Sequence, residues 1–528
     1  MTNSINEMDE AELFFVIGSN TTEQHPLIGT RIINAVERGA RLIVVDPRDI
    51  PLARYAHMHL RQNIGTDVAV LNGLMNIIIE EGLYDREYVG TRTEGFDELK
   101  RTVSRYTPRV VEQISGVGAE DLVLVAREYA RAGKAMLLYA MGITQHTTGT
   151  DNVKTCANLA MLTGHVGRPS TGVNPLRGQN NVQGACDMGG LPVVYTGYQK
   201  VGDEPVIQKF SDAWGVEDLD KAPGLTITTM MEAADKGDLK AMYVMGENPF
   251  LSDPDSKHIE RALSNLDLLV VQDIFLSETA ALADVVLPAA CFAEKTGTYT
   301  NTERRVQLSC KAIDPPGSAR ADWEIIQDVC TRAGYPMSYA DPSEIMAEIN
   351  RVTPSYAGIT YPRLETGYGL SWPCPNEEHP GTAYLHKDRF SKGLGTFLPC
   401  EFKPMAEPPD TEYDFILTTG RMYFQYHTGT MSRRIGILER EAPEPLVEIN
   451  PEDARKLGIR DRDLVEISSR RGAVKIKAEV TARVPRKVVF STFHFHEVPM
   501  NLLTNPAHDP VSGIPEYKGC AVKIRRCA

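Results

Sequence analysis

Short apolar runs alternate with amphipathic helical patterns in the first part of the chain. The run at 12–17, ELFFVI, ends in the turn Gly18-Ser19-Asn20, and apolar residues then recur at helical spacing between about residues 25 and 38. A second apolar run, RLIVVDPR, follows and reaches Asp46. A strand, loop, helix and strand in this order predict a βαβ unit of a parallel sheet, which binds ligands at the carboxyl ends of its strands.

The same pattern recurs between residues 241 and 273. AMYVM is followed by Gly246-Glu247-Asn248, a helical pattern, and the apolar run LDLLVVQD, which ends at Asp273. We interpret the two copies as nucleotide-binding-like halves of one chain, each with a Gly-x-Asn turn and a closing Asp. Neither copy contains a complete G-x-G-x-x-G, which disfavours a plain NAD or FAD site. Many α/β proteins contain such units without binding a ligand at each of them, so this alternative stays open.

From about residue 413 the pattern changes to that of a β-rich domain. LVEISSRRGAVKIKAEV alternates apolar and polar positions on both sides of an Arg-Arg-Gly turn and predicts a β-hairpin, whereas the Pro- and Gly-rich sequence before it is typical of connecting loops. We predict an α/β fold class: two Rossmann-like domains with parallel sheets and a C-terminal β-barrel-like domain. The expected boundaries are 1–179, 180–345 with an inserted segment at 292–320, a connecting segment at 346–406, and the barrel-like domain at 407–528.

Composition and charge narrow the class of protein. The 528 residues are 42% hydrophobic and 24% charged, which is typical of a soluble globular chain of several domains. The formal net charge of −14 argues against a general nucleic-acid-binding protein, and no run of 18 apolar residues could span a membrane. None of the nine cysteines is spaced as C-x-x-C, so the sequence predicts reduced thiols and no metal-ligand set.

A long polar loop, NPLRGQNNVQGACDMG at 174–189, carries the most informative chemistry. A loop this rich in amides is either solvated or wrapped around a polar ligand. Its one cation, Arg177, can hold a carboxylate with two parallel hydrogen bonds, and Gln179 can add a donor. A surface or ion-pairing arginine is the alternative reading of Arg177. We take Arg177 and Gln179 as the candidate catalytic residues.

This loop resembles the substrate and cofactor loop of formate dehydrogenase catalytic subunits, within the molybdopterin oxidoreductase superfamily. VVDPR, TGHVGRPSTGVNP, DVVLPA, TNTERRVQ, HTGTMSRR and EINPEDARKLGI are also similar to family sequence and follow the family order. The resemblance covers essentially the whole chain. It implies an enzyme that oxidises formate to CO2, or runs the reverse reaction, and a C-terminal barrel of the double-psi type.

The resemblance also implies a bis(molybdopterin guanine dinucleotide) cofactor carrying molybdenum or tungsten. Carried over by position, the residues expected at one dinucleotide are Gly18, Asn20, Glu23, Asp46, Gly65 and Asp67, with Gly142 and Gln145 close to the cofactor. Those expected at the other dinucleotide are Gly246, Asn248, Asp273, Thr300, Arg305 and Asp322. The candidates for pterin and phosphate contacts in the last domain are Thr419, Gly420, Arg421, His427, Thr430, Asn501, Asn505, Tyr517 and Lys518.

One part of the family pattern is not found in the sequence. The cysteine or selenocysteine that binds the metal, the histidine beside it and the four-cysteine motif of a [4Fe–4S] cluster are expected before Met1. We therefore expect a fragment that lacks its N-terminal segment, is inactive alone and exposes apolar surface. Cys186 belongs to the ordinary family loop and is not expected to replace the ligand. His494 and His496 are interpreted as packing or surface histidines.

Two other classes remain as alternatives. A noncatalytic scaffold subunit of a respiratory complex can keep this fold without the metal, and another molybdopterin oxidoreductase, such as a nitrate reductase, would keep both. The amide-rich loop with Arg177 favours the formate enzyme over both. Expected partners are formate or CO2 and iron–sulfur or flavin electron-transfer subunits, without nucleic acid or a membrane span, in the cytoplasm.

Overall fold

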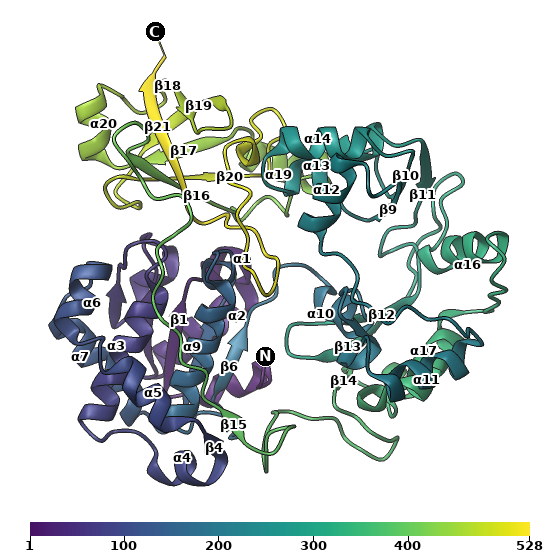
Figure 1. The fold of residues 1–528 in the computed structure, drawn as a ribbon, viewed down its shortest axis with the longest axis horizontal. Helices are drawn as coiled ribbons and strands as arrows, with labels where there is room; N and C mark the ends of the chain where they lie inside the picture. Colours follow the sequence, from purple (N-terminus) through teal and green to yellow (C-terminus); the bar gives the residue numbers. More distant parts are fainter. Residues whose placement is uncertain (528) are drawn as a thin grey trace. The chain divides into compact units, whose positions relative to one another are not determined.

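The computed structural model describes residues 1–527, and they form two compact units (Figure 1). Unit 1 comprises residues 1–176, 251–257 and the described residues from 384 onward, and unit 2 comprises residues 177–250 and 258–383. Both the N-terminal α/β domain and the C-terminal barrel therefore belong to unit 1.

The core of unit 1 is a five-stranded parallel sheet with the strand order β3-β2-β1-β5-β6. Its strands are β1 (Leu13–Ile17), β2 (Arg41–Val45), β3 (Met58–Leu60), β5 (Ala135–Tyr139) and β6 (Gly172–Pro175). The β1 side chains are buried on both faces: Phe14 and Val16 in one apolar cluster, and Leu13, Phe15 and Ile17 in another. Burial on both faces is what a parallel sheet requires, and it explains the unbroken apolar runs in the sequence.

Helices supply both apolar clusters. The predicted helix after β1 forms as α1 (Thr21–Gln24) and α2 (Pro26–Glu37), and Pro26 suits the first turn of α2 because its φ is already helical. The others are α3 (Asp67–Glu80), α4 (Arg86–Arg92), α5 (Phe96–Val103), α6 (Pro108–Ser115), α7 (Ala119–Arg131), α8 (Met141–Thr144) and α9 (Gly149–Leu162). Two short strands, β4 (Thr93–Glu94) and β15 (Gly395–Thr396), pair in parallel and tie residues beyond 383 to this domain.

The C-terminal part of unit 1 contains a closed six-stranded barrel in the order β16-β20-β17-β19-β18-β21. Its elements are β16 (Phe415–Gly420), α19 (Gly436–Glu441), β17 (Leu446–Ile449), α20 (Pro451–Leu457), β18 (Leu464–Ser468), β19 (Ala473–Val480), β20 (Val488–Thr492) and β21 (Cys520–Arg526). The predicted hairpin is confirmed, since β18 and β19 pair antiparallel from Leu464↔Lys477 to Ser468↔Ala473. Alternate β19 residues are buried, as the alternating pattern predicted.

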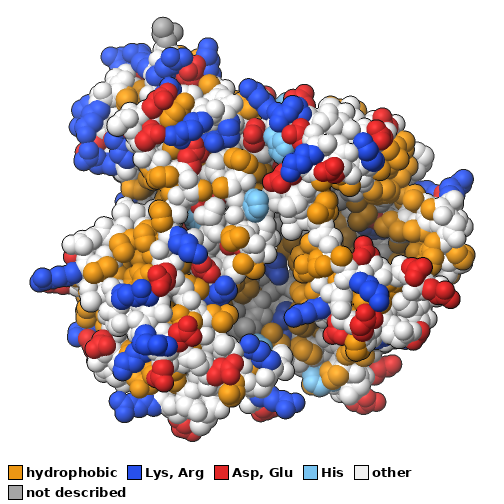
Figure 2. Space-filling view, viewed as in Figure 1, with side chains coloured by type: hydrophobic (Ala, Val, Ile, Leu, Met, Phe, Trp, Pro, Cys, Tyr) orange, Lys and Arg blue, Asp and Glu red, His pale blue; other side chains and the backbone are white. Residues whose placement is uncertain are grey.

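Unit 2 contains a second parallel sheet with the order β11-β10-β9. Its elements are α12 (Ile227–Lys236), β9 (Ala241–Met245), β10 (Leu268–Asp273), α15 (Glu278–Ala281) and β11 (Val285–Pro288). The helices α13 (Pro249–Ser252) and α14 (Ser256–Ser264) lie partly in this unit and partly in the segment 251–257 of unit 1. One face packs Val244, Leu269 and Val271 into an apolar cluster. Apolar side chains also reach the surface around β10 and β11 (Figure 2), and Tyr243, Met245 and Val285 are 41%, 51% and 42% exposed.

The rest of unit 2 is built around an antiparallel sheet, β12-β13-β14. Its elements are α10 (Val182–Asp187), β7 (Val194–Tyr195), β8 (Gln199–Lys200), α11 (Glu204–Trp214), β12 (Gly297–Thr300), β13 (Arg305–Ser309), α16 (Asp322–Arg332), α17 (Pro342–Val352), α18 (Tyr361–Glu365) and β14 (Leu370–Ser371). Part of the segment predicted as a connection, residues 346–383, therefore contributes helices, a strand and core residues such as Tyr356 and Ile359.

Candidate functional site

The centre of the first sheet is a topological switch point. β1 has β2 on one side and β5 on the other, and the loops that leave β1 and β5 meet there: the amide of Gly142 donates to the carbonyl of Gly18 over 3.0 Å. A Cβ on Gly142 would lie 2.6 Å from the Gly18 oxygen, and Gly18 itself has φ +57°. Both positions therefore require glycine, and they form a backbone-lined cradle where open α/β sheets bind ligands.

The turn after β1 offers unpaired polar groups to this edge. The buried Oδ1 of Asn20 and Nε2 of Gln24 have no hydrogen-bond partner among residues 1–527. Glu23, the residue expected to contact a dinucleotide, lies on α1 and is partly exposed. Buried polar atoms are nearly always satisfied in folded proteins, so those of Asn20 and Gln24 indicate a surface prepared for a polar ligand.

Two buried carboxyls follow the neighbouring strands. Asp46 comes directly after β2, and the amide of Arg48 donates to its Oδ1 over 2.9 Å. Burial raises the pKa of Asp46, against the opposing effects of Arg48, His59 and Lys518. Asp67 is the first residue of α3, and burial raises its pKa to about 6 although Gln62 donates to it over 3.1 Å. Gly65, with φ +79°, makes the turn before α3.

The barrel contributes two partly buried cations, Lys518 and Arg421, to the same unit. Lys518, which precedes β21, donates its Nζ to the carbonyl of Thr419, and its amide donates to the carbonyl of Gln145 over 3.3 Å. Burial lowers the pKa of Lys518 to about 7, and the nearby Arg421 lowers it further while Asp46 raises it. Burial also lowers the pKa of Arg421, which follows Gly420 at the end of β16. The predicted residues from both domains of unit 1 therefore lie within electrostatic range of one another.

Two histidines lie beside Arg421, of which His494 is buried and His427 is partly buried. The amide of Met422 donates to Nε2 of His494 over 3.0 Å, so Nδ1 carries the proton and donates to the carbonyl of His427. Burial lowers the pKa of His494 to about 3 and that of His427 to about 4, so both are neutral. His496 is exposed beside Arg433 and Glu497.

Several predicted cofactor residues of the barrel bind the protein's own backbone. Asn501 donates its Nδ2 to the carbonyls of Leu251 and Ser252 over 2.8 and 2.9 Å, and the hydroxyl of Tyr517 donates to the Ser252 carbonyl over 2.8 Å. Asn505 donates to the Gly519 carbonyl over 2.8 Å. These side chains hold the segment 251–257 against the barrel. Thr430 lies 2.9 Å from Thr428, hydroxyl to hydroxyl.

The second copy of the Gly-x-Asn turn is organised differently. Gly246 has φ +63° and its amide donates to the Gln272 carbonyl over 2.9 Å. Oδ1 of Asn248 accepts from the amide and the hydroxyl of Thr279, so this asparagine holds the start of α15. Asp273 accepts from the amide of Ile274 over 2.7 Å.

The other three residues predicted at that dinucleotide also have protein partners. The amide of Thr300 donates to Oδ1 of Asn181 over 2.8 Å. Arg305 donates to Glu303 over 2.9 Å, and Asp322 accepts from Gln272 over 2.7 Å. An ion pair with Lys295 completes the surroundings of Asp322.

The loop with Arg177 lies in unit 2. The amide of Arg177 donates to the Thr302 hydroxyl over 3.1 Å, its Nε donates to Oε1 of Gln183 over 3.3 Å, and Nη1 lies 4.0 Å from Sγ of Cys186. Gln179 is partly buried in the same loop. These contacts hold both the backbone and the guanidinium of Arg177 within the loop.

Sequence reasoning did not identify the buried carboxyl of Asp187 or the acid–histidine contact near Gln145. In unit 1, Oε1 of Glu516 lies 4.0 Å from Nδ1 of His146, and burial raises the pKa of Glu516. Asp187 closes the amide-rich loop, but its partners Tyr356 and Trp372 lie more than 160 residues away in the chain. No local pattern signals such contacts.

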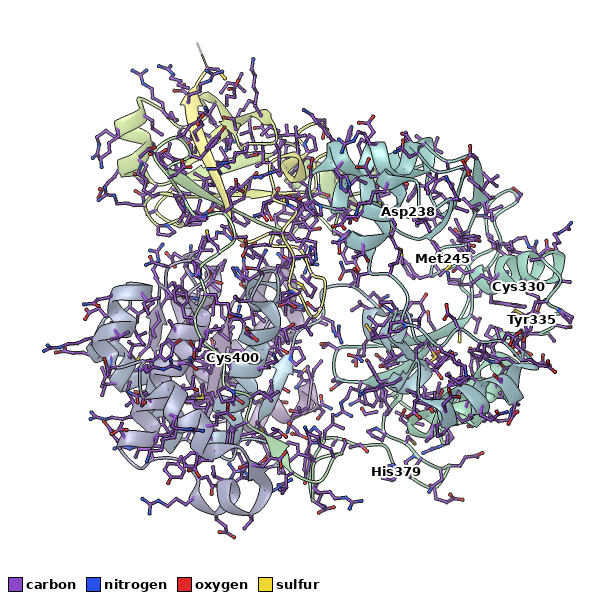
Figure 3. All side chains as sticks on the ribbon, in the orientation of Figure 1. Asp238, Met245, Cys330, Tyr335, His379 and Cys400 are labelled. Atoms are coloured by element: carbon purple, nitrogen blue, oxygen red, sulfur yellow. The ribbon has the colours of Figure 1, made fainter. Side chains whose placement is uncertain are left out.

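No group of three or more His, Cys, Asp or Glu side chains in residues 1–527 is arranged to hold a metal ion. The nine cysteines are free; Cys330 lies on α16, and Sγ of Cys400 lies 3.6 Å from Oδ1 of Asp151 (Figure 3). No helix of this part of the chain has the length and apolarity needed to cross a membrane.

Comparison with known proteins agrees with this geometry. Residues 1–332 match the family model of the molybdopterin oxidoreductases, and residues 415–521 match that of the molybdopterin dinucleotide binding domain. The chain belongs to the molybdopterin oxidoreductase family. The resemblance found in the sequence motifs is thereby confirmed.

Relatives and a solved structure of this family align along nearly the whole chain. The chain is 52% identical to the F420-dependent formate dehydrogenase subunit alpha of Methanocaldococcus jannaschii, over 100% of the chain and 78% of that protein. It is 41% identical to formate dehydrogenase H of Escherichia coli, over 100% of the chain and 74% of that protein. Acetylene hydratase from Pelobacter acetylenicus shares the fold with a TM-score of 0.75 at 21% identity, covering 98% of the chain and 78% of that structure.

The residues of unit 1 fit the dinucleotide that this family binds. The Gly18–Gly142 contact leaves no side chain at the switch point, and the buried Oδ1 of Asn20 is an acceptor that has no partner in the described chain. Lys518 and Arg421 are partly buried cations whose pKa values burial lowers, and such charges are disfavoured unless negative charge lies nearby. A phosphate would supply that charge.

Proposed function

We propose that this chain is the catalytic subunit of a formate dehydrogenase that uses a bis(molybdopterin guanine dinucleotide) cofactor with molybdenum or tungsten. The observation that carries the proposal is the loop at 174–189, which the sequence resemblance assigns to formate and in which Thr302 and Gln183 hold the backbone and the guanidinium of Arg177. Support also comes from relatives named formate dehydrogenase that are 41–52% identical along the whole chain.

In this proposal Arg177 binds the formate carboxylate. Its guanidinium stays charged and can donate two parallel hydrogen bonds, which sets the plane of the substrate and leaves the C–H bond directed away from the arginine. Gln179 adds a donor to the same anion. Formate then loses one proton and two electrons as it becomes CO2. When bound, the cofactor supplies the redox chemistry that accepts those electrons.

The dinucleotide contacts are part of the same proposal. In unit 1, Asn20, Asp46 and Asp67 provide hydrogen-bonding groups for a base and ribose, while Lys518 and Arg421 neutralise phosphate. In unit 2, the turn at Gly246 and the carboxyl of Asp273 are the corresponding groups. The other cofactor residues predicted from the sequence now hydrogen-bond to protein groups. They remain candidates for cofactor contacts, and such contacts would replace those hydrogen bonds.

The electron acceptor and location complete the proposal. The catalytic subunit would pass electrons to an iron–sulfur or flavin subunit in the cytoplasm, and the relatives named F420-dependent are 49–52% identical. We infer a deazaflavin such as F420 as the final acceptor. Reduction of NAD but not of F420 by the purified complex would contradict this inference.

The test uses the complex purified from its host with all its subunits. Formate-dependent reduction of an artificial dye, bound metal and released guanine nucleotide are measured for the wild type, Arg177→Ala and Arg177→Lys. We expect Arg177→Ala to raise the KM for formate roughly a hundredfold or more, because a charge-assisted pair of hydrogen bonds is lost, and Arg177→Lys to recover only part of it. Metal and nucleotide content should stay unchanged in both variants.

A wild-type complex without metal, guanine nucleotide or formate oxidation would refute the proposal and would favour the noncatalytic scaffold. A complex with cofactor that reduces nitrate but does not oxidise formate would favour the other branch of the family.

A further inference from the structure

Asp187, the last residue of α10, is a fully buried carboxyl surrounded by donors. Its Oδ1 accepts from Nε2 of Gln183 over 2.8 Å and from the hydroxyl of Tyr198 over 2.9 Å. Its Oδ2 accepts from the hydroxyl of Tyr356 over 2.5 Å and from Nε1 of Trp372 over 2.7 Å. Its side chain is 0% exposed.

These four donors match an ionised carboxylate. An ionised carboxylate accepts at both oxygens, and an indole N–H can only donate, so Oδ2 must be an acceptor where it meets Trp372. Burial, and after it the neighbouring carboxylate of Asp187, raises the pKa values of Tyr198 and Tyr356, which keeps both phenols protonated as donors. No cation contacts the carboxylate in these bonds, so its charge is held by neutral hydrogen bonds alone.

The carboxylate determines which way the Gln183 amide points. Nε2 donates to Asp187 and also to the Tyr198 hydroxyl over 2.9 Å, which in turn donates to Asp187. The other end of the amide, Oε1, therefore faces Arg177 and accepts from its Nε over 3.3 Å. A flipped amide would set its oxygen against the carboxylate and its N–H groups against the guanidinium, and both contacts would be repulsive. Asp187 thereby fixes an acceptor behind the guanidinium of Arg177.

The loop is held at two further points. The amide of Arg177 donates to Thr302, and Oδ1 of Asn181, whose φ is +62°, accepts from the amide of Thr300. A Cβ on Gly184 would lie 2.1 Å from that Oδ1, so the first turn of α10 needs glycine there. The backbone of the loop is therefore fixed by β12 and its following turn, while the side chain of Arg177 is oriented through Gln183.

We propose that Asp187 is a positioning residue for Arg177, acting through the amide of Gln183, so that the guanidinium presents a fixed face to the substrate carboxylate. This rests on the proposed function, in which Arg177 binds formate. A carboxylate buried with no cation is costly unless every lone pair is used, and a role in stability alone would not require the Gln183 amide to point one way.

The variant Asp187→Asn tests the orientation directly. Trp372 can only donate, so the new amide must keep its oxygen towards Trp372 and turn its NH2 group towards Gln183. Gln183 must then flip and set its own NH2 group against Arg177. We expect the KM for formate to rise roughly ten- to hundredfold, as for a displaced positioning group, with kcat changed much less.

Two further variants separate orientation from stability. Tyr356→Phe removes one donor to Oδ2 of Asp187 but leaves the bond from Gln183 to Oδ1, so it should lower the melting temperature without a comparable rise in KM. Gln183→Met removes the relay itself and should raise the KM as Asp187→Asn does. In the double variant the two effects should not add, because both act through one amide. Gln183→Met also carries the test if Asp187→Asn does not fold.

The measurements use the cofactor-loaded complex and two readouts. Formate kinetics give KM and kcat, and calorimetric titration with nitrate, a planar anion of the same charge that has no C–H bond to lose, gives anion affinity without turnover. Asp187→Asn should weaken both while metal and nucleotide content stay unchanged. Unchanged KM and nitrate affinity in Asp187→Asn and Gln183→Met, or additive effects in the double variant, would overturn the proposal.

The same measurements distinguish this proposal from the proposed function. If the wild type binds nitrate and Asp187→Asn weakens that binding, but no form oxidises formate, then the positioning role stands and the proposed function fails. If Arg177→Ala abolishes formate binding and Asp187→Asn does not weaken it, then only the positioning role fails. A wild type that binds neither anion would overturn both.

Discussion

Lys518 is the residue of unit 1 whose charge is affected by both a neighbouring arginine and a neighbouring aspartate. It is partly buried and contacts both the barrel, at Thr419, and the first domain, at Gln145. Burial and Arg421 lower its pKa to about 7, and Asp46 is the acid that opposes this shift. A bound anion raises the pKa of such a lysine, because the anion offsets the free-energy cost of burying the charged ammonium group. The same residue therefore destabilises the ligand-free chain and favours the bound dinucleotide.

Lys518→Met should make the ligand-free chain more stable near neutral pH. The pKa of about 7 in the folded chain lies below the value of about 10.4 expected when unfolded, so the unfolded chain holds more protons between these limits. The stability of the wild type therefore rises with pH through this window, and the cost of the buried charge is complete below about pH 7. The advantage of the variant should be greatest at or below pH 7 and should shrink towards pH 10, as measured by thermal unfolding.

Lys523→Met is the matched control, because Lys523 pairs with Glu412 at the surface. It should show no comparable pH-dependent gain in stability. Lys518→Met should also retain less guanine nucleotide after purification than the control does. A variant that keeps its nucleotide and has the same pH profile as the wild type would contradict this role for Lys518.

At the scale of elements, strand ends and turns carry the ligand chemistry. The strands β1, β2 and β5 bring Gly18, Asp46 and Gly142 to one edge of the first sheet, since parallel strands end on the same side. The hydrophobic pattern of the sequence was sufficient for β1, β2, β9, β10 and the hairpin β18–β19, because each is a short run of clear period. The hydrophobic pattern was insufficient for residues 346–383. Their Pro and Gly content is typical of a loop, but the segment folds and packs with core residues that are distant in sequence.

Gly142→Ala tests the contact between the two loops of the switch point. The added Cβ would lie 2.6 Å from the Gly18 oxygen and 2.7 Å from its Cα, so both loops must move apart. We expect a loss of roughly 1–3 kcal/mol in the free energy of unfolding, as for other overpacked sites, and reduced nucleotide retention. Urea unfolding followed by circular dichroism measures the first effect.

Gly90→Ala, in α4, is the matched control because no atom lies within 4 Å of its added Cβ. It should be neutral or slightly stabilising, since alanine favours a helix over glycine. Equal losses of stability in the two variants would show that the Gly18–Gly142 contact has no special role.

At the scale of the whole molecule, charge and apolar surface determine behaviour in solution. The net charge of −14 opposes binding to nucleic acid, while the second sheet presents apolar side chains that parallel sheets normally cover. Such a surface is typical of a region that binds another segment or another protein. The isolated chain should therefore bind an apolar dye.

Met245→Lys should reduce binding of the dye 8-anilinonaphthalene-1-sulfonate by the isolated chain. Met245 is 51% exposed at the end of β9 (Figure 3), so a lysine there can be solvated without loss of core packing. The melting temperature should change little, whereas Val244→Lys, on the buried face of the same strand, should unfold the sheet. Unchanged dye binding in Met245→Lys would show that this face is not the exposed apolar surface.

The sequence by itself determined the fold class, the repeated Gly-x-Asn turns, the barrel hairpin and the identity of the charged loop residue Arg177. These features depend on local periodicity and on motifs of a few residues, which the chain displays directly. Only the tertiary structure decided which side chains share a site: Lys518 with Asp46, Asn501 with Ser252, and Asp187 with its distant donors. The physical reason is that burial and hydrogen bonding are set by residues hundreds of positions apart, whose approach no local pattern records.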